Sequence, residues 1–290
     1  MNWAKIAAFL SLAAGLAGCA APGSGIGPFE RTGASCAGPA VFAPAAAANA
    51  SSLTLLDLAP FGRPERGWAI YAPWTAQTIA TACAPETPGF AHALAHWQAS
   101  HRLTPHGAID PPTVEALKTV WQGKRPFVAL RAKAICPEPP DEAALEPAGP
   151  ADVLEGAKPV RLRPAALRAL RRMTAAARRE VPALAAEPDL LKAFSGYRSP
   201  AYDAERCTAE GNCDGVVRAQ CSAHRTGMAV DLMVGAAPGF SVDGSADPNR
   251  QLQSRTPAYR WLVRNATRFG FVNYVFEPWH WEWVGRVSDR

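Results

Sequence analysis

Two histidines, one aspartate and one glutamate near the C-terminus have the residue types and spacing of a hydrolytic metal site. The stretch Ser222-Ala-His-Arg-Thr-Gly-Met-Ala-Val-Asp231 contains the first pair, and Glu277-Pro-Trp-His280 contains the second. A catalytic zinc ion takes three protein ligands and keeps one position open for water. His224, Asp231 and His280 can be these ligands, which leaves Glu277 as the general base beside the water. One zinc ion is therefore the expected cofactor.

The composition is that of a globular protein. The 290 residues suffice for one large domain or two smaller ones. With 48% hydrophobic and 19% charged residues, the chain is not of the disordered class. Its net charge of +5 permits attraction to anionic cell-wall polymers or lipid head groups. That charge is too small to indicate nucleic acid as a partner, and the sequence has no motif of a nucleic-acid-binding protein.

The N-terminus has the pattern of an export signal. A short positive region precedes the apolar run Ile6–Leu16, which is too short for a transmembrane helix. Leu16-Ala-Gly-Cys19 resembles a bacterial lipobox, which implies a signal peptide over residues 1–18 and lipidation of the Cys19 thiol. The residue after Cys19 is Ala20 and not an aspartate. By the same resemblance, this favours the periplasmic face of the outer membrane as the location of the protein. A plain signal peptide with an incidental cysteine is the alternative.

The remaining cysteines suit an oxidising compartment. An even number of them predicts disulfides, and the sequence leaves their pairing open. Cys207, Cys213 and Cys221 lie close together, so at least one of these three pairs elsewhere or stays free. A structural zinc ion on these three is the rival interpretation, but they lack paired C-x-x-C spacing. The six residues are Cys36, Cys83, Cys136, Cys207, Cys213 and Cys221.

Shifts in composition divide the rest of the chain. Residues 19–52 are rich in Ala, Gly and Pro, which is typical of a flexible tether. Residues 53–127 are predicted to form a small helical domain. Repeated prolines and acids indicate a linker over residues 128–159. A catalytic domain is predicted over residues 160–287.

The helical domain shows a weak sequence pattern. Apolar residues at helical spacing predict two helices, one with Phe90, Leu94 and Trp97 and one with Leu117, Val120 and Trp121. Thr113 is the expected cap of the second helix. A resemblance to the three-helix peptidoglycan-binding domains of cell-wall hydrolases rests on the pattern Leu94…Trp97-Gln98…Leu103…Gly107…Ile109-Asp110…Thr113…Leu117…Trp121-Gln122. The alternative is a helical pair that only packs on the catalytic domain. His92 and His96 have no third ligand nearby, so they are interpreted as surface residues.

Helices and short strands alternate in the catalytic region. Pro164 is predicted to open a helix with an apolar stripe and a solvated face rich in arginine. Leu190–Phe194 is predicted to be a buried strand that leads into Ser195-Gly-Tyr-Arg198. An arginine placed where a strand enters a turn can bind an anionic group with two hydrogen bonds.

Two further strands are expected to carry the metal-capable residues. In Met228–Val234, alternation turns Asp231 away from the apolar face. In the final strand, His280 and Glu282 share one face. Between these strands, residues 238–255 are predicted to form a polar surface loop. The sequence also predicts a helix that Thr256-Pro257 opens and Gly270 ends. A strand over residues 271–276 is predicted to follow it.

Four motifs in order resemble the VanY-type D-alanyl-D-alanine carboxypeptidases. They are Ser195-Gly-Tyr-Arg-Ser, Ser222-x-His-x-x-Gly-x-Ala-x-Asp231, Trp261-Leu-x-x-Asn-Ala-x-x-Phe-Gly-Phe271 and Glu277-Pro-Trp-His-Trp281. This family belongs to a wider group of zinc peptidases that includes lysostaphin and the hedgehog signalling domain. The resemblance spans roughly residues 160 to 285. It implies an α+β fold with a small antiparallel sheet and flanking helices, preceded here by the small helical domain.

The same resemblance assigns roles to individual residues. It implies that His224, Asp231 and His280 bind zinc and that Glu277 is the base. Arg198 would contact the substrate carboxylate or the developing oxyanion, and Ser222 would lie in the substrate pocket. Two features depart from the family pattern beside that pocket, so they concern the cleaved bond more than the metal chemistry. The first is Asp203, which with its neighbours stands where family members commonly have a glutamine, a few residues after the Tyr-Arg-Ser turn. The second is the loop with three cysteines before Ser222, which looks like an insertion.

The function that the resemblance implies is removal of the terminal D-Ala from peptidoglycan stem peptides in the cell envelope. The expected partners are stem peptides and, through the lipid anchor, a membrane. An endopeptidase of the same fold is one alternative. A non-catalytic wall-binding lipoprotein is another, although the presence of Glu277 argues against it. A serine hydrolase is disfavoured because the sequence has no Gly-x-Ser-x-Gly motif.

Overall fold

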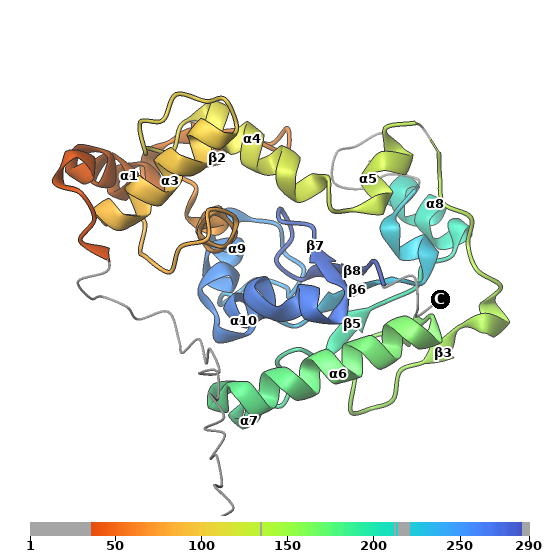
Figure 1. Cartoon of the computed structure of the whole chain (residues 1–290). Coiled ribbons are helices and arrows are strands. Elements are labelled where there is room, and N and C mark those ends of the chain that lie inside the picture. The colour runs from red at the N-terminus through yellow and green to blue at the C-terminus, as the bar shows by residue number, and fades with distance from the viewer. Residues whose placement is uncertain (1–35, 134, 212, 214–220, 286–290) are drawn as a thin grey trace, which may run out of the picture. The chain divides into compact units, whose positions relative to one another are not determined.

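A four-stranded antiparallel sheet with strand order β5–β6–β8–β7 lies at the centre of the catalytic region (Figure 1). Its strands are β5 Ala193–Ser195, β6 Ala229–Leu232, β7 Phe271–Asn273 and β8 His280–Trp283. The register of the central pair β6 and β8 places Asp231 opposite His280. The computed structural model describes residues 36–133, 135–211, 213 and 221–285, all within one compact unit.

Helices accompany this sheet in the second half of the chain. They are α6 Pro164–Glu180, α7 Pro182–Ala186, α8 Pro200–Ala209, α9 Asp247–Arg255 and α10 Pro257–Asn265. The 3₁₀ helices η5 Ala223–Thr226 and η6 Ala266–Phe269 lead into β6 and β7. Thr256 caps α10 by accepting from the Tyr259 N–H, and Gly270 ends η6 with a φ of 81°, as predicted. Mixed helices and a small antiparallel sheet confirm the α+β prediction.

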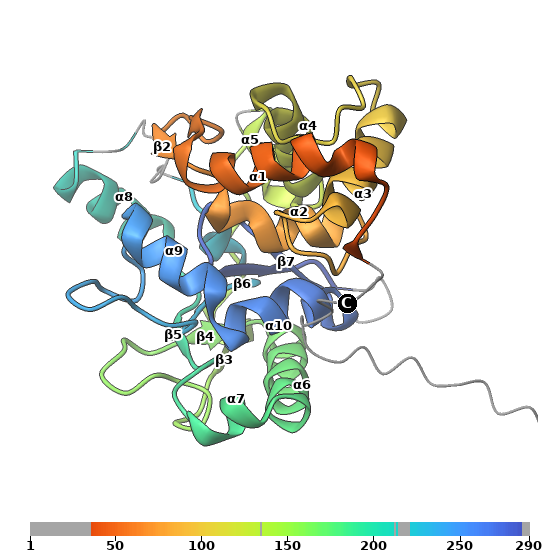
Figure 2. The same ribbon diagram turned by 90° about the vertical axis from the view of Figure 1, so that its left-hand side faces the viewer.

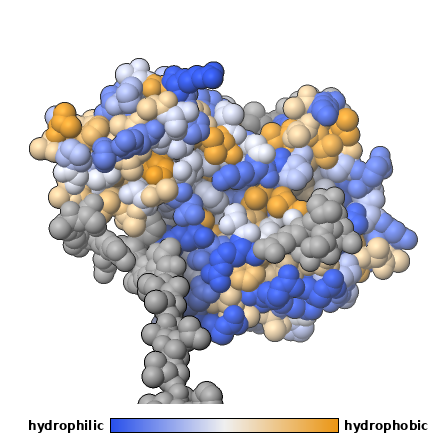
Figure 3. Space-filling view, viewed as in Figure 1, coloured by the Kyte–Doolittle hydropathy of each residue, from blue (hydrophilic) through white to orange (hydrophobic). Residues whose placement is uncertain are grey.

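Helix α6 has the amphipathic character that the sequence predicts. Leu167, Leu170 and Met173 are buried on one face. On another face Arg171 is exposed and pairs with Glu146 and Asp152. Hydrophilic side chains cover the region of α6 in Figure 3. The arginine-rich face of this helix is therefore solvated.

The strand predicted over Leu190–Phe194 is shifted in the structure. β5 begins only at Ala193, because Leu191 adopts a positive φ of 67° that interrupts an extended chain. Ala193 pairs with Leu232 and Ser195 with Asp231. The strand therefore still delivers Arg198 beside β6.

Three N-terminal helices meet around a turn at Gly107. They are α1 Ala43–Leu55, which follows η2 Ala40–Phe42, α3 Pro88–Ser100 and α4 Pro111–Gln122. Asn49 donates from Nδ2 to the Gly107 carbonyl over 2.9 Å, and Gln98 Oε1 accepts from the Gly107 N–H over 2.8 Å. α1 contacts α3 (Figures 1 and 2). The tether predicted to residue 52 is wrong from residue 36 onward, since its alanines favour a helix and its Asn49 is buried in this turn.

Short elements lie between α1 and α3 and between α4 and α6. They are β1 Asp57–Leu58, β2 Glu65–Arg66, η3 Ala69–Tyr71, α2 Ala72–Thr78, α5 Pro126–Arg131, η4 Glu142–Ala144, β3 Glu146–Pro147 and β4 Arg161–Leu162. β1 pairs with β2 and β3 with β4, both antiparallel. The β3–β4 pairing shows that the predicted linker, residues 128–159, is partly fixed to the start of the catalytic region.

The cap of α4 is Asp110 and not the predicted Thr113. Asp110 Oδ1 accepts from the Thr113 N–H over 2.9 Å. Burial alone would raise the pKa of Asp110, but the hydrogen bonds from Thr113 and the contact with His106 hold it below its ordinary value. The helix begins earlier than predicted because prolines fit its first positions. The capping residue is therefore the one before these prolines, Asp110.

Replacing Asp110 by alanine is expected to lower the free energy of unfolding by about 1 kcal/mol, because α4 loses its cap. The Asp110→Asn variant is the matched control, since asparagine caps a helix equally well without the charge. The contribution of the carboxylate to stability is present above the pKa of an unfolded aspartate and is lost as the pH falls through the lower folded pKa. Urea denaturation at neutral pH and at acid pH measures both effects. Equal stability of the alanine and asparagine variants would contradict the capping role.

Helix α9 occupies part of the stretch predicted to be a surface loop, residues 238–255. Its buried residues are polar: Asn249, Arg250, Gln253 and Ser254. Arg250 donates from Nη2 to the Tyr71 hydroxyl and from Nε to the Phe276 carbonyl, each over 2.8 Å, and its Nη1 lies 3.2 Å from Glu65 Oε1. The loop prediction was wrong because the buried face of α9 is polar and lacks the apolar stripe that identifies a helix.

Disulfides join the cysteines, as predicted for an oxidising compartment. The bonds are Cys36–Cys83, Cys136–Cys221 and Cys207–Cys213. The rival zinc site on the three clustered cysteines is therefore excluded. The predicted signal peptide and Cys19 lie outside the described residues. Within the described part of the chain, no helix is long and apolar enough to cross a membrane.

Candidate active site

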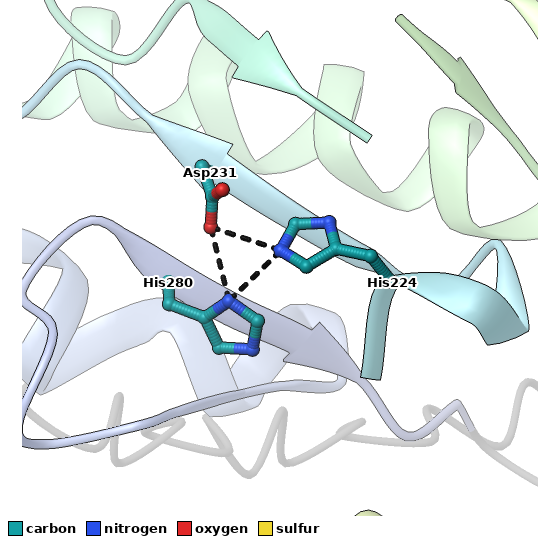
Figure 4. A group of neighbouring side chains, drawn as sticks. All are labelled: His224, Asp231 and His280. Atoms are coloured by element: carbon teal, nitrogen blue, oxygen red, sulfur yellow. Dashed lines mark hydrogen bonds and ion pairs between the residues drawn. The ribbon is translucent and has the colours of Figure 1, made fainter. Parts of the chain in front are cut away.

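His224, Asp231 and His280 meet at the junction of η5, β6 and β8 (Figure 4). His224 Nε2 lies 3.2 Å from Asp231 Oδ1 and 3.1 Å from His280 Nδ1. His280 Nδ1 lies 3.0 Å from the same aspartate oxygen. One atom of each side chain therefore faces a common point, and the structure brings together the three residues that the sequence singles out as metal ligands.

Local structure holds the two histidine rings in these orientations. Gly227 ends η5 with a φ of 69°, a conformation that L side chains rarely adopt, so the chain can turn directly from His224 into β6. His224 Nδ1 lies 2.6 Å from the Gly196 carbonyl, which leaves Nε2 toward the cluster. His280 Nε2 lies 3.2 Å from Glu282 Oε1, which leaves Nδ1 toward the cluster. Each ring thus uses one nitrogen for orientation and presents the other.

The donor set fits a zinc ion. Two imidazole nitrogens and one carboxylate oxygen are ligands that zinc prefers, and three protein ligands leave a coordination position open. Ligands about 2.0–2.2 Å from a tetrahedral ion lie roughly 3.3–3.6 Å apart. The observed separations of 3.0–3.2 Å require only a slight expansion. His224, Asp231 and His280 can therefore hold one zinc ion.

The electrostatics of the cluster centre on one buried anionic carboxylate. Burial would raise the pKa of Asp231, but both histidines and Arg198 outweigh this and hold it well below its ordinary value. Burial lowers the pKa of His224 to about 4, so that ring is neutral at neutral pH. Burial also lowers the pKa of His280, but hydrogen bonds with Asp231 and Glu282 outweigh burial and raise it to about 9. At neutral pH the site thus contains a buried anionic carboxylate, one neutral imidazole and one protonated imidazole, and a metal ion would take the place of the His280 proton.

Glu277 lies at the edge of the cluster in the turn between β7 and β8. Its N–H donates to the Tyr274 carbonyl over 2.7 Å, and its own carbonyl accepts from the His280 N–H over 3.0 Å. Its Oε2 lies 4.0 Å from His280 Nδ1, too far for a direct hydrogen bond. Burial raises the pKa of the Glu277 carboxyl. A carboxyl with a raised pKa beside a metal site can accept a proton and return it.

Arg198 contacts the cluster itself. Its Nη2 donates to Asp231 Oδ2 over 2.8 Å and to Ser195 Oγ over 2.9 Å. The sequence predicts that Arg198 contacts an anionic group of the substrate. In the structure Arg198 also binds the carboxylate of Asp231, one of the three candidate metal ligands. It lines the same cleft as Glu277 and the cluster.

Ser222 and Asp203 form a second polar contact in this cleft. Ser222 Oγ donates to the Asp203 carboxylate over 3.1 Å, and Arg225 Nη2 lies 3.7 Å from it. Burial raises the pKa of Asp203, although Ser222 and the nearby arginines oppose the shift. The aspartate that departs from the family pattern thus binds the serine expected in the substrate pocket.

The cleft has a volume of about 400 Å³, and one of its sides comes from α5. This side of the cleft was not predicted from the sequence, because the predicted border between the helical domain, residues 53–127, and the linker, residues 128–159, falls within α5 and neither segment carries a signal for a site there. Cys136–Cys221 joins the chain after α5 to the residue before Ser222. The α5 region contributes Arg125, Phe127, Val128, Arg131 and Ala132 to the cleft.

Glu282 is a further residue of the site that the sequence does not assign. Burial would raise its pKa, but the adjacent Arg125 outweighs burial and lowers it to about 2. Glu282 is therefore an anion next to His280. Strand alternation, which puts both residues on one face, is the signal that could have identified it.

The comparisons with known proteins agree with this geometry. The VanY family, described as D-alanyl-D-alanine carboxypeptidase, matches residues 159–286. No curated protein matches the chain. The matched segment contains the whole sheet, the three clustered residues and Glu277. Residues 159–286 therefore form a domain of the VanY family of D-alanyl-D-alanine carboxypeptidases.

Proposed function

We propose that the protein is a zinc-dependent carboxypeptidase that removes the terminal D-Ala from peptidoglycan stem peptides. The observation that carries the proposal is the trio of donor atoms 3.0–3.2 Å apart, with the Glu277 carboxylate beside it in an open cleft. His224, Asp231 and His280 would hold the ion. When bound, zinc supplies Lewis acidity toward a carbonyl oxygen and toward water.

Glu277 moves the proton in this proposal. It accepts a proton from the attacking water and then gives it to the nitrogen of the departing D-Ala. A buried carboxyl with a raised pKa suits both steps, because it holds a proton more readily than an exposed glutamate does. The turn from Tyr274 to His280, closed by two backbone hydrogen bonds, keeps this carboxylate beside the cluster.

Arg198 provides positive charge in the cleft. We assign to it a contact with the substrate carboxylate or with the oxyanion that develops on the scissile carbonyl. Stabilising such an oxyanion lowers the activation free energy by several kcal/mol. Its contacts with Asp231 and Ser195 fix the guanidinium before substrate binds. Ser222, which is held by Asp203, contributes a hydroxyl to the substrate pocket.

The cellular setting follows from the family and from the N-terminal sequence. The family acts on the cell wall, which indicates the envelope. Lipidation at Cys19 would attach the protein to a membrane, with the periplasmic face of the outer membrane as the proposed location. Residues 53–127, which include α3 and α4, form the unit proposed to resemble peptidoglycan-binding domains.

Defined muropeptides test the reaction. The zinc-loaded protein is incubated with a pentapeptide muropeptide and with a crosslinked dimer, and the products are identified by mass. Loss of one alanine from the pentapeptide supports the carboxypeptidase. Cleavage of the dimer alone would identify an endopeptidase instead. Binding to purified sacculi without any product would identify a wall-binding protein.

Removal of the metal is expected to destabilise the protein. The three ligands come from η5, β6 and β8, so zinc binds only the folded chain. At a free zinc concentration 100 times the dissociation constant, the stabilisation is about 2.7 kcal/mol. For a protein of 290 residues, this corresponds to roughly 4–5 °C in melting temperature. Differential scanning fluorimetry before and after chelation, with zinc added back, measures the shift. An unchanged melting temperature would contradict the metal site.

A further inference from the structure

Arg125 reaches the active site from outside the VanY domain. It lies between α4 and α5, and only 6% of its surface is exposed. Its Nε donates to Glu282 Oε1 over 2.9 Å, its Nη2 donates to the same oxygen, and its Nη1 donates to Gln122 Oε1 over 2.9 Å. The guanidinium lies 4.2 Å from the centre of the Tyr274 ring. These contacts fix one orientation of a buried guanidinium.

Glu282 connects this guanidinium to His280. The oxygen that accepts from Arg125 lies 3.2 Å from His280 Nε2, while His280 Nδ1 lies 3.0 Å from Asp231 Oδ1. A histidine that donates one ring N–H to a carboxylate presents the lone pair of its other nitrogen, and the carboxylate makes that nitrogen a stronger ligand. A continuous series of contacts therefore runs from Arg125 to an atom of the candidate metal site.

We propose that Arg125 is a positioning residue for the metal site: it fixes Glu282, which orients His280 so that Nδ1 faces the ion. The inference rests on the proposed metal site and deepens it. It follows that residues 159–286, which match the family, do not contain every residue that shapes the metal site. The chain before them supplies a residue that sets metal affinity.

A second buried ion pair provides a matched control. Glu65 and Arg250 also join the N-terminal part of the chain to the catalytic region, and the Glu65 side chain is only 1% exposed. Glu65 contacts Arg250 and Tyr71, and neither of these is in the metal cluster. Glu65→Gln and Glu282→Gln therefore make the same chemical change in similar surroundings, but only Glu282 touches a candidate ligand.

The test measures the affinity of the full-length protein for Zn²⁺ by competition with a chelating dye. Glu282→Gln is expected to weaken binding about 10–100-fold. Arg125→Gln weakens it in the same direction, and Arg125→Lys falls between that variant and the wild type. The double variant binds as weakly as Glu282→Gln alone, because Arg125 acts through Glu282. Glu65→Gln lowers the melting temperature but leaves Zn²⁺ affinity within about twofold. Circular dichroism establishes which variants are folded. If Arg125→Gln does not fold, Arg125→Lys is the variant that tests the role of Arg125.

The outcomes separate this inference from the proposed function. If the wild type binds no Zn²⁺, the metal site fails and the role of Arg125 fails with it. If the wild type binds Zn²⁺ and the Arg125 and Glu282 variants bind it equally well, only the positioning role is overturned. An equal loss of affinity in Glu65→Gln would also overturn it, since the effect would then belong to any buried pair.

Discussion

Replacing Glu277 by glutamine is expected to lower kcat for stem-peptide hydrolysis by about 10²–10⁴-fold, the usual contribution of a general acid–base. Glutamine has nearly the same shape but cannot accept a proton from water at neutral pH. Its side chain would still fill the turn between Tyr274 and His280, whose hydrogen bonds come from the backbone and from the Asn273 side chain. Because Glu277 Oε2 lies 4.0 Å from His280 Nδ1 and is not one of the three clustered donors, Zn²⁺ affinity should stay within a few fold.

Measuring turnover and Zn²⁺ binding on the same preparation makes this prediction decisive. Glu187→Gln is a suitable control because that glutamate is exposed, lies between α7 and β5, and does not line the cleft. Near-native hydrolysis by Glu277→Gln would remove the acid–base role. Loss of Zn²⁺ together with activity would mean that Glu277 holds the metal, and the ligand set would need revision.

Two residues of the site, Asp231 and His280, could be placed from the sequence because they lie on the regular strands β6 and β8. Alternation along β6 and β8 decides which side chains share a face, so Asp231 and His280 could be placed toward one cleft from the sequence alone. The pairing of these two strands in register then brings the residues together. Local signals also located α10 and the η6 turn that follows it, since the cap and proline that open α10 and the glycine that ends η6 all lie within one short stretch.

What could not be predicted depends on contacts between distant parts of the chain. Arg125 and Glu282 are 157 residues apart, and neither has a local pattern that indicates the other. The α5 side of the cleft likewise depends on a disulfide between residues 85 apart, whose pairing the sequence leaves open. Helix α9 shows the same limit for secondary structure, since its buried face is polar and its partners come from β2, η3 and the chain after β7.

Replacing Arg250 by methionine is expected to lower the free energy of unfolding by about 3–5 kcal/mol, because it leaves a buried carboxylate without its partner. The Arg250 side chain is fully buried, and it satisfies Glu65, the Tyr71 hydroxyl and the Phe276 carbonyl together. Methionine fills a similar volume but satisfies none of these groups. The loss should therefore come from the polar groups left behind and not from a cavity.

Urea denaturation of Arg250→Met and of Arg255→Met separates this effect from a general change in α9. Arg255 is exposed on the same helix, so its replacement should change stability by no more than about 0.5 kcal/mol. Arg250→Lys should lie between the wild type and Arg250→Met, since lysine keeps the charge but lacks the fork of donors that reaches several acceptors. If Arg250→Met is as stable as Arg255→Met, the network with Glu65 and Tyr71 does not hold the N-terminal part of the chain to the catalytic region.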